Sequence, residues 1–185
     1  MSAIFFIFDK SSNDIKYKSE IINSSLDSIS HRGNQKKEVF FEKDKALGFK
    51  RLKTSSYQIQ PYVHKNNQLV IVIDGEIYNE SEIINKSNIS TKNINEAIAN
   101  IYLKNQNDII KDLNGMFTIC IFDIQKSRVV FIKDKLGSKP LFYYEDSKQF
   151  ICASEIKAIK NFLGNLKVDY SCALNSIFLA GRPPY

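Results

Sequence analysis

The stretch that decides the fold is MSAIFFIFD, residues 1–9, an apolar run rich in Ile and Phe. Short runs of this composition are typical of a buried strand. The run is too short to span a bilayer, and it lacks the basic lead and small-residue cleavage site of a signal peptide. A buried first strand would hold residue 2 and its α-amine in the core, where they could do chemistry. Taken alone, however, the stretch favours a strand that is only structural.

The composition indicates one globular domain. The chain has 185 residues, of which 43% are hydrophobic and 12% aromatic, enough to build a full core. The net charge of +6 comes from 26 Lys and Arg against 20 Asp and Glu. These charges are spread out, with no basic block longer than Lys36-Lys37, whereas nucleic-acid binding needs a clustered basic patch. We therefore expect a cytoplasmic protein that binds neither nucleic acid nor a membrane.

The cysteines argue against a disulfide framework and against a metal site. Cys120, Cys152 and Cys172 are far apart in the chain and odd in number. Each lies in an apolar or helical context, which predicts buried free thiols in a reducing compartment. No zinc-type spacing exists, and the chain has only 2 His. We expect no metal and no cofactor in this chain.

Local patterns predict a mixed α and β fold with many hairpins and few βαβ units. Besides the first strand, we expect strands at 39–41, 46–52, 57–63, 69–73, 116–122, 129–132, 141–144 and 150–152. Helices are expected at 14–29, from 79 through 84, and at 95–103, 108–113, 154–162 and 169–179. Gly33 is a plausible helix end and Ser154 a plausible helix cap, and Gln60-Pro61 suggests an edge strand or a bulge.

Two places combine polar residues with apolar strands. The apolar strand 69–73 runs into Asp74-Gly75, which predicts a glycine-containing turn before a helix that starts at Asn79. A backbone N–H at such a strand end is a usual way to hold an oxyanion. Arg51 lies among core residues on a strand, where its planar guanidinium would suit a carboxylate. On its own, Arg51 favours a structural ion pair over a substrate contact.

These pieces, taken in order, resemble the class II glutamine amidotransferase domain of asparagine synthetases, which is of the N-terminal-nucleophile type. The resemblance covers nearly the whole chain. Each motif is weak alone, and their shared order and spacing make them specific. The matching segments are residues 3–9, His31-Arg32-Gly33, Leu47-Gly48, Arg51-Leu52, Gln60-Pro61, Gly75-Glu76-Ile77-Tyr78-Asn79, Leu113-Asn114-Gly115-Met116-Phe117, Asp134, Gly137, Lys139-Pro140-Leu141, Ala153-Ser154-Glu155 and Lys157-Ala158.

The resemblance implies an α+β fold, a four-layer αββα sandwich of antiparallel sheets. It also implies a catalytic Cys at position 2, exposed by removal of Met1, with its own α-amine as base. Here position 2 is Ser2, whose hydroxyl is harder to deprotonate than a thiol with a pKa of about 8.5. N-terminal Ser and Thr hydrolases exist in the wider superfamily, so this change alone does not exclude activity.

The resemblance also identifies the remaining site positions. Its oxyanion hole uses an Asn side chain and the next Gly N–H, which fall on Asp74 and Gly75. An ionised carboxylate cannot donate a hydrogen bond. The acid that pairs with the substrate ammonium falls on Ile94, counted back from Glu96. The arginine that clamps the substrate carboxylate matches Arg51. The loop after Gly33 departs as well, with Asn34-Gln35 where the family usually has Pro-Asp.

We therefore expect residues 1–165 to form an amidotransferase-like domain without glutaminase activity. Residues 166–185 would begin a linker towards an absent ATP-dependent synthetase domain. No pyrophosphate or Walker loop is visible, so ATP and Mg are implied only for that partner domain. The partner would be an amide-forming ligase of asparagine synthetase, β-lactam synthetase or peptide cyclase type.

Other readings stay open at this stage. One is an active N-terminal Ser amidohydrolase, or a weak glutaminase that supplies ammonia. Another is that Ser2 replaces a natural Cys to trap substrate. The departures at Asp74 and Ile94 argue against the second, since one trapping change would leave them intact. Binding of glutamine and a homodimer are also left open.

Overall fold

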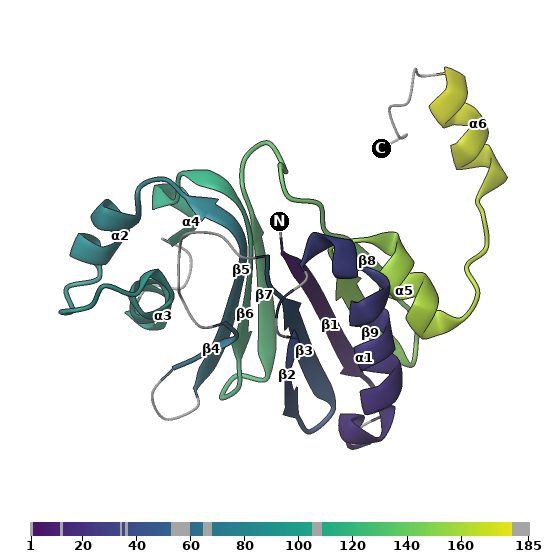
Figure 1. Ribbon diagram of the computed structural model, residues 1–185, viewed down its shortest axis with the longest axis horizontal. Helices are drawn as coiled ribbons and strands as arrows, with labels where there is room; N and C mark the ends of the chain where they lie inside the picture. The colour runs from purple at the N-terminus through teal and green to yellow at the C-terminus, as the bar shows by residue number, and fades with distance from the viewer. Residues whose placement is uncertain are drawn as a thin grey trace.

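Two antiparallel sheets face each other, and helices cover both outer faces (Figure 1). The structure, a computed structural model, describes residues 2–11, 13–33, 35, 37–52, 60–64, 68–104 and 109–178. The four layers run helices, sheet, sheet, helices. This is the α+β sandwich that the sequence resemblance implies.

The first sheet has the strand order β2-β3-β1-β9-β8, with every pairing antiparallel. The apolar first strand β1 (Ala3–Asp9) lies at its centre, between β3 (Lys45–Lys50) and β9 (Gln149–Ala153). The edge strands are β2 (Lys37–Glu42) and β8 (Phe142–Glu145). The prediction of a buried first strand is confirmed, since its first five residues, 3–7, are all buried.

The second sheet has the order β4-β5-β6-β7. Its strands are β4 (Tyr62–Val63), β5 (Leu69–Ile77), β6 (Gly115–Asp123) and β7 (Arg128–Lys133). The short β4 is an edge strand, as expected for a segment that follows Gln60-Pro61. Residues 57–59 of the predicted strand 57–63 lie outside the described residues.

The helices divide between the two sheets. The first sheet carries α1 and α5, and the second carries α2 and α3. In Figure 1, α6 stands apart at the upper right. None of the described helices combines the length and apolar character needed to cross a membrane. The helices are η1 (Ile15–Lys18), α1 (Ser19–Ser28), η2 (Ser30–Arg32), α2 (Glu80–Lys86), α3 (Ile94–Lys104), α4 (Ile109–Asp112), α5 (Ile156–Leu163) and α6 (Tyr170–Phe178).

The period-2 alternation of β1 fills two core layers from one strand. Ile4 and Phe6 lie in the hydrophobic cluster between the sheets. Phe5 and Ile7 lie in the cluster shared with α1 and α5. Because neighbouring side chains of a strand point to opposite faces, a strand that is apolar at every position is buried on both sides. A third cluster joins the second sheet to α2 and α3.

The predicted turn at Asp74-Gly75 is wrong. Both residues lie inside β5, paired in register with Thr118 and Phe117 of β6. Gly75 has φ +123°, and a Cβ there would collide with the carbonyl oxygen of Met116. The glycine is therefore needed because the backbones of β5 and β6 approach each other closely here, and not because the chain reverses direction.

The predicted cap at Ser154 is also wrong. The helix α5 begins at Ile156, and Glu155 is the residue that precedes it. The Ser154 hydroxyl oxygen instead accepts a hydrogen bond from the Ile4 backbone N–H at 2.9 Å, and the Ser154 N–H donates to the Ile4 carbonyl at 3.0 Å. Ser154 thus extends the pairing of β9 with β1 beyond the end of the regular ladder.

The cysteine prediction holds for two residues of the three. Cys120 and Cys152 are buried free thiols, and Cys172 is exposed. Burial raises the pKa of the Cys152 thiol to about 12 and also raises the pKa of Cys120. Cys172 lies on α6, where residues 170–174 are all exposed, so the apolar pattern of that helix does not translate into burial within this chain.

Candidate functional site

The start of β1 meets β5 at the upper end of the sandwich, where the N label lies in Figure 1. The backbone nitrogen of Ser2 donates a hydrogen bond to Asp74 Oδ1 at 2.7 Å. Since Ala3 pairs with Lys50 in β3, Arg51 follows beside Ser2. Residues 72 positions apart in the chain are therefore in direct contact, and the fold brings the predicted nucleophile position to the predicted oxyanion position.

Asp74 is the centre of this corner. Its side chain is fully buried, and its second oxygen, Oδ2, accepts a hydrogen bond from Arg32 Nη2 at 2.9 Å. Arg32 is itself 4% exposed, and its Nε donates to the carbonyl oxygen of Ser2 at 3.0 Å. Residue 2 is thus hydrogen-bonded at both of its backbone polar groups, with Arg32 bound to its carbonyl oxygen and Asp74 bound to its nitrogen.

A second carboxylate connects the corner to the surface. Arg32 Nη1 lies 3.5 Å from Glu155 Oε1, and His31 Nε2 lies 2.8 Å from the same oxygen. The His31 side chain is 57% exposed. The sequence motif His31-Arg32-Gly33 was visible, but no role was predicted for Arg32 or Glu155. Only the tertiary contact shows which carboxylates the guanidinium meets.

The loop that carries Arg32 packs against the segment that carries Arg51. A Cβ on Gly33 would lie 2.7 Å from the carbonyl carbon of Arg51, closer than real contacts allow. The Arg51 carbonyl also accepts a hydrogen bond from the Gln35 N–H at 3.1 Å. Gly33 ends η2 in an extended conformation. The glycine is therefore required by this close approach, and the half-buried Arg51 is fixed next to the corner.

Asp134 orders a loop at the partner strand of Gly75. Its carboxylate accepts hydrogen bonds from the N–H groups of Phe117, Leu136 and Ser138 at 3.0 to 3.1 Å. Burial opposes ionisation of Asp134, but these hydrogen bonds outweigh it and hold its pKa below the ordinary value. Because Phe117 pairs with Gly75, this loop closes over the same end of the second sheet.

Ile94 lies in an apolar setting. It is the first residue of α3, is 4% exposed, and belongs to the cluster that contains Ile73 and Ile77 of β5. The preceding Asn93 caps this turn, its side-chain oxygen accepting from the Asn95 N–H at 2.9 Å. An isoleucine side chain offers no charge and no hydrogen bond to an ammonium group.

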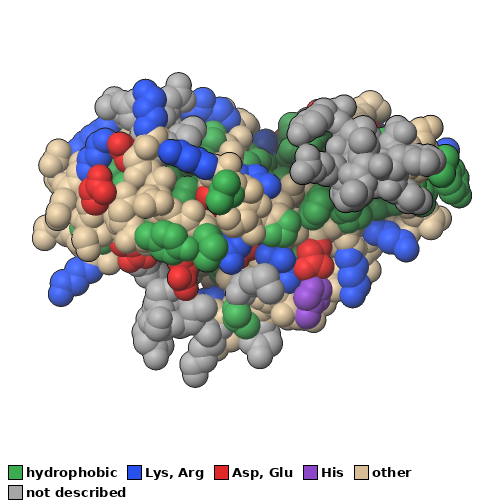
Figure 2. Space-filling model, turned by 90° about the horizontal axis from the view of Figure 1, so that it is seen from above, with side chains coloured by type: hydrophobic (Ala, Val, Ile, Leu, Met, Phe, Trp, Pro, Cys, Tyr) green, Lys and Arg blue, Asp and Glu red, His purple; other side chains and the backbone are tan. Residues whose placement is uncertain are grey.

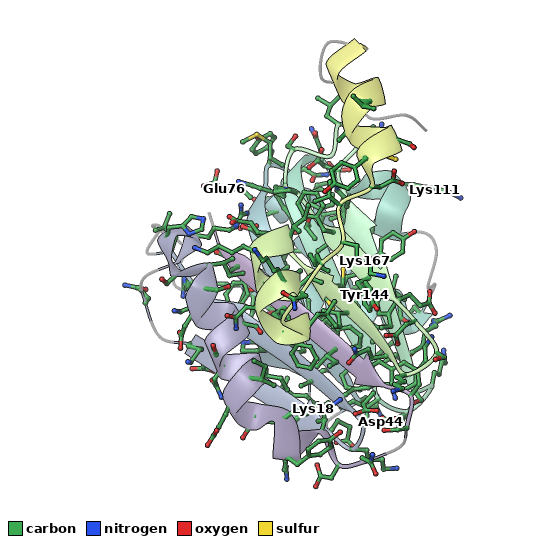
Figure 3. All side chains as sticks on the ribbon, turned by 90° about the vertical axis from the view of Figure 1, so that its right-hand side faces the viewer. Lys18, Asp44, Glu76, Lys111, Tyr144 and Lys167 are labelled. Atoms are coloured by element: carbon green, nitrogen blue, oxygen red, sulfur yellow. The ribbon has the colours of Figure 1, made fainter. Side chains whose placement is uncertain are left out.

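The corner lies at the upper end of the molecule, far from the end that carries Lys18 and Asp44. Figure 3 shows Glu76, the residue after Gly75, towards the top, and Lys18 and Asp44 near the bottom. Figure 2 looks onto the upper end and shows charged side chains of both signs among hydrophobic ones. The chemistry available at the corner is that of a buried ion pair bound to the backbone of residue 2, in which Asp74 Oδ1 accepts a hydrogen bond from the Ser2 nitrogen.

Comparison with protein families gives one match over almost the whole chain. Residues 1–183 match the family described as "Glutamine amidotransferase domain". Similar curated proteins include asparagine synthetase (glutamine-hydrolysing) 2 of Bacillus subtilis, at 31% identity over 88% of this chain and 22% of the relative. A putative asparagine synthetase 2 of Methanocaldococcus jannaschii is 34% identical over 76% of this chain and 32% of the relative.

Solved structures give the same fold. A glutamine phosphoribosylpyrophosphate amidotransferase from Bacillus subtilis superposes with a TM-score of 0.67, at 20% identity, over 86% of this chain and 43% of that one. A solved structure of the allosteric regulatory enzyme of purine biosynthesis gives a TM-score of 0.69 at 18% identity, over 86% of this chain and 43% of that one. The chain spans only about a fifth to a third of the length of the two curated relatives above.

Proposed function

The chain belongs to the glutamine amidotransferase domain family and is of the asparagine synthetase type, and from that premise we propose that its glutaminase activity has been lost. In this proposal the domain serves as a scaffold for an ATP-dependent ligase that forms amides. The ligase would take its nitrogen from free ammonia or from an amine within its own substrate. Such a domain keeps the fold of the family and gives up its hydrolytic step.

One observation carries the proposal. At the position where the family places an oxyanion donor, the buried carboxylate of Asp74 accepts hydrogen bonds from Ser2 and Arg32. A carboxylate is an acceptor only, and it repels the negative charge that develops on an amide oxygen under attack. Loss of one oxyanion donor costs on the order of 10²–10³ in rate, and a fixed negative charge costs more.

Two further positions agree with this proposal. Ser2 supplies a hydroxyl, a weaker nucleophile at neutral pH than a thiol. Ile94 is buried in an apolar cluster, where a substrate ammonium would lose its hydration without gaining a partner. Arg51 matches the family arginine that binds the substrate carboxylate, so weak binding of glutamine through that end is compatible with the proposal.

The partner in this proposal is an ATP-dependent synthetase domain, in the same chain or in a separate one. The two curated relatives described above are named as asparagine synthetases, and they are about three to five times as long as the matched region, which spans 22% and 32% of their lengths. ATP and Mg would belong to that partner domain. Asparagine synthetase, β-lactam synthetase and peptide cyclase chemistry all fit, and the protein would work in the cytoplasm.

A second function is favoured by the position of Ser2. Its nitrogen lies at the corner, 2.7 Å from Asp74, where an N-terminal nucleophile would act. In this alternative the mature chain is an N-terminal Ser amidohydrolase, or a weak glutaminase that supplies ammonia. It requires a free and neutral α-amine on Ser2.

Assays of glutamate and ammonia release from glutamine separate the two functions. The wild-type chain and its matched control Ser2→Ala should release equal amounts, and a glutamine-analogue electrophile should leave Ser2 unmodified. Ser2→Cys alone should stay inactive because Asp74 remains. Adding Asp74→Asn and Ile94→Asp to Ser2→Cys should raise the rate by about 10² or more. Ammonia release by the wild type above the Ser2→Ala control, or acylation of Ser2, would overturn the proposal.

A further inference from the structure

We propose that the edge strand β8 (Phe142–Glu145) is the surface through which two copies of this chain associate, by antiparallel pairing of their β8 strands about a two-fold axis at Tyr143. β8 is the outer strand of the first sheet and lies beside α5 (Figure 1). The pairing joins the first sheets of the two copies into one continuous sheet. This inference goes beyond the proposed function, because it does not depend on whether glutamine is hydrolysed.

Among the edge strands of the two described sheets, β8 is the one that exposes aromatic side chains. Phe142 is 39% exposed and Tyr143 is 73% exposed. Proteins usually protect sheet edges with charged side chains or by keeping the edge strand very short. β2 and β7 carry a charged residue at both ends, and β4 has only two residues. β8 has one charged residue, Glu145, so its edge is the least protected against pairing with another chain.

The hydrogen-bonding pattern of the first sheet shows which backbone groups of β8 point outwards. The Ser154 N–H donates to the carbonyl oxygen of Ile4, the residue opposite it in β1. Because these directions alternate along a strand, the N–H and C=O of the preceding Ala153 point towards β8, where Ala153 pairs with Phe142. The same alternation along β8 turns the N–H and C=O of Tyr143 away from the sheet. Tyr143 therefore presents a donor and an acceptor at the open edge.

The turn after β8 agrees with this assignment, since the Asp146 N–H donates back to the Gln149 carbonyl at 3.0 Å. Asp146 is three residues after Tyr143, so it has the opposite direction in the alternation. The Tyr143 ring stacks on Phe150, with centroids 6.1 Å apart and planes at 21°. Because this contact already orders the exposed side chain, its ordering costs less free energy on association.

A two-fold axis at Tyr143 makes the edge self-complementary. Each Tyr143 then donates to, and accepts from, the Tyr143 of the second copy, as in a hydrogen-bonded pair of an antiparallel ladder. Phe142 of one copy lies opposite Tyr144 of the second, and aromatic pairs of this kind stabilise sheets. Homo-oligomers with two-fold symmetry are also the commonest kind.

The charges at the two ends of β8 favour a second copy as the occupant. Antiparallel pairing brings the end of one strand beside the start of the other, so Glu145 of one copy approaches Lys139 of the second. Within its own chain, Glu145 is already paired with Lys10 Nζ at 2.7 Å, so its charge is compensated before association. Ile156 begins α5, which packs against β8, and its 51% exposure adds apolar area beside the strand.

The first test measures self-association of the full chain by sedimentation velocity. The interface is small, so we expect a weak dimer with a dissociation constant between about 1 μM and 1 mM. Tyr143→Lys places like charges opposite each other at the axis and should weaken the dimer at least about tenfold. Tyr143→Phe keeps the ring and should stay within about threefold of wild type. The matched control Val63→Lys adds the same charge at a 39% exposed position of the edge strand β4 and should also stay within about threefold.

Cross-linking tests the register. The variants carry Cys172→Ser, which removes the exposed native thiol. Residues on the axis lie about 5.5 Å apart between Cα atoms, and disulfides span Cα separations of about 4.4–6.8 Å. Tyr143→Cys should therefore give a disulfide-linked dimer with oxidised glutathione. Val63→Cys in the same background is the matched control and should remain a monomer on a non-reducing gel.

Three results would overturn the inference. The first is a chain that stays monomeric at about 1 mM, including one that binds an extended apolar peptide through this edge instead. The second is a dimer that Tyr143→Lys does not weaken, because such a dimer uses another surface. If Tyr143→Lys does not fold, cross-linking decides, and equal yields of dimer from Tyr143→Cys and Val63→Cys are the third.

Discussion

Replacing Asp74 with Asn should destabilise this protein, although Asn is the residue that the family chemistry requires at that position. The change removes the buried partner of the Arg32 guanidinium, since Arg32 is 4% exposed and donates to Asp74 Oδ2 at 2.9 Å, whereas the partly exposed Glu155 lies farther away, at 3.5 Å. Breaking a buried ion pair by removing one partner costs about 3–5 kcal/mol. The Coulomb energy of two charges about 4 Å apart at an effective dielectric constant of about 20 is of the same size, about 4 kcal/mol.

A double-mutant cycle isolates the pair itself. The free energy of unfolding of wild type, Asp74→Asn, Arg32→Gln and the double variant comes from urea unfolding followed by far-UV circular dichroism. We expect each single variant to lose about 3–5 kcal/mol and the double variant to lose less than the sum, with a coupling energy of about 2–3 kcal/mol. The matched control is the pair Lys10–Glu145, whose side chains are 28% and 55% exposed. Its coupling should stay below about 1 kcal/mol.

The result that refutes this reasoning is a coupling energy no larger than that of the exposed control pair. An Asp74→Asn variant as stable as wild type would refute it too. Either result would mean that Arg32 finds another partner or reaches solvent in the variant. It would also mean that the ion pair between Arg32 and Asp74 does not stabilise the fold.

Three further predictions concern other parts of the chain. Burial opposes ionisation of Asp9, but hydrogen bonds led by that from Lys18 outweigh it and hold the pKa of Asp9 well below its ordinary value. The stability that ionised Asp9 contributes is therefore present above about pH 4 and is lost as the pH falls further. Asp9→Asn should be about 3 kcal/mol less stable than wild type at neutral pH, and its free energy of unfolding should fall less steeply with pH in acid unfolding curves. Thiol titration of the native protein should label Cys172 alone, since the other 2 of the 3 cysteines are buried. Cys172→Ser should abolish labelling of the native protein. Fast labelling of that variant would contradict the burial of Cys120 and Cys152. Gly48→Ala should lose about 1–3 kcal/mol in urea unfolding through overpacking, because its Cβ would collide with Leu26 Cδ1, and Leu26→Val should recover part of that loss; an undiminished loss in the double variant would show that the strain lies elsewhere.

The sequence predicted the framework well because the framework is built from periodic apolar runs. Residues 3–9 are apolar at nearly every position, and they form the central strand of the first sheet, buried on both faces. The helix at 95–103 and the hairpin at 141–152 were placed within a few residues of α3 and of β8 with β9. Such runs report burial directly, because each position needs only an apolar neighbour and not a particular one.

The site was predicted less completely because it depends on particular partners. The local pattern of Asp74-Gly75 indicated a turn, whereas the pair continues a strand that only a glycine at φ +123° can follow past Met116. Ser154 has the features of a cap, yet its hydroxyl binds the Ile4 N–H across 150 positions of sequence. Arg32 was seen only as part of a motif, since no local signal shows that its guanidinium will meet both Asp74 and Glu155.

The retained and the altered parts of the corner have a common explanation in its connectivity. Arg32 holds the Ser2 carbonyl, Asp74 holds the Ser2 nitrogen, and Gly33 packs on the backbone of Arg51. These contacts join β1, β3, β5 and η2 at one end of the sandwich, so they stabilise the fold whether or not glutamine is hydrolysed. Under the proposed loss of activity, a change from the family's amide to a carboxylate at position 74 would remove a catalytic donor and gain the ion pair with Arg32. In that proposal, selection for the fold alone would keep Arg32, Gly33 and the position of residue 2, and it would place no demand on the nucleophile or on the ammonium partner.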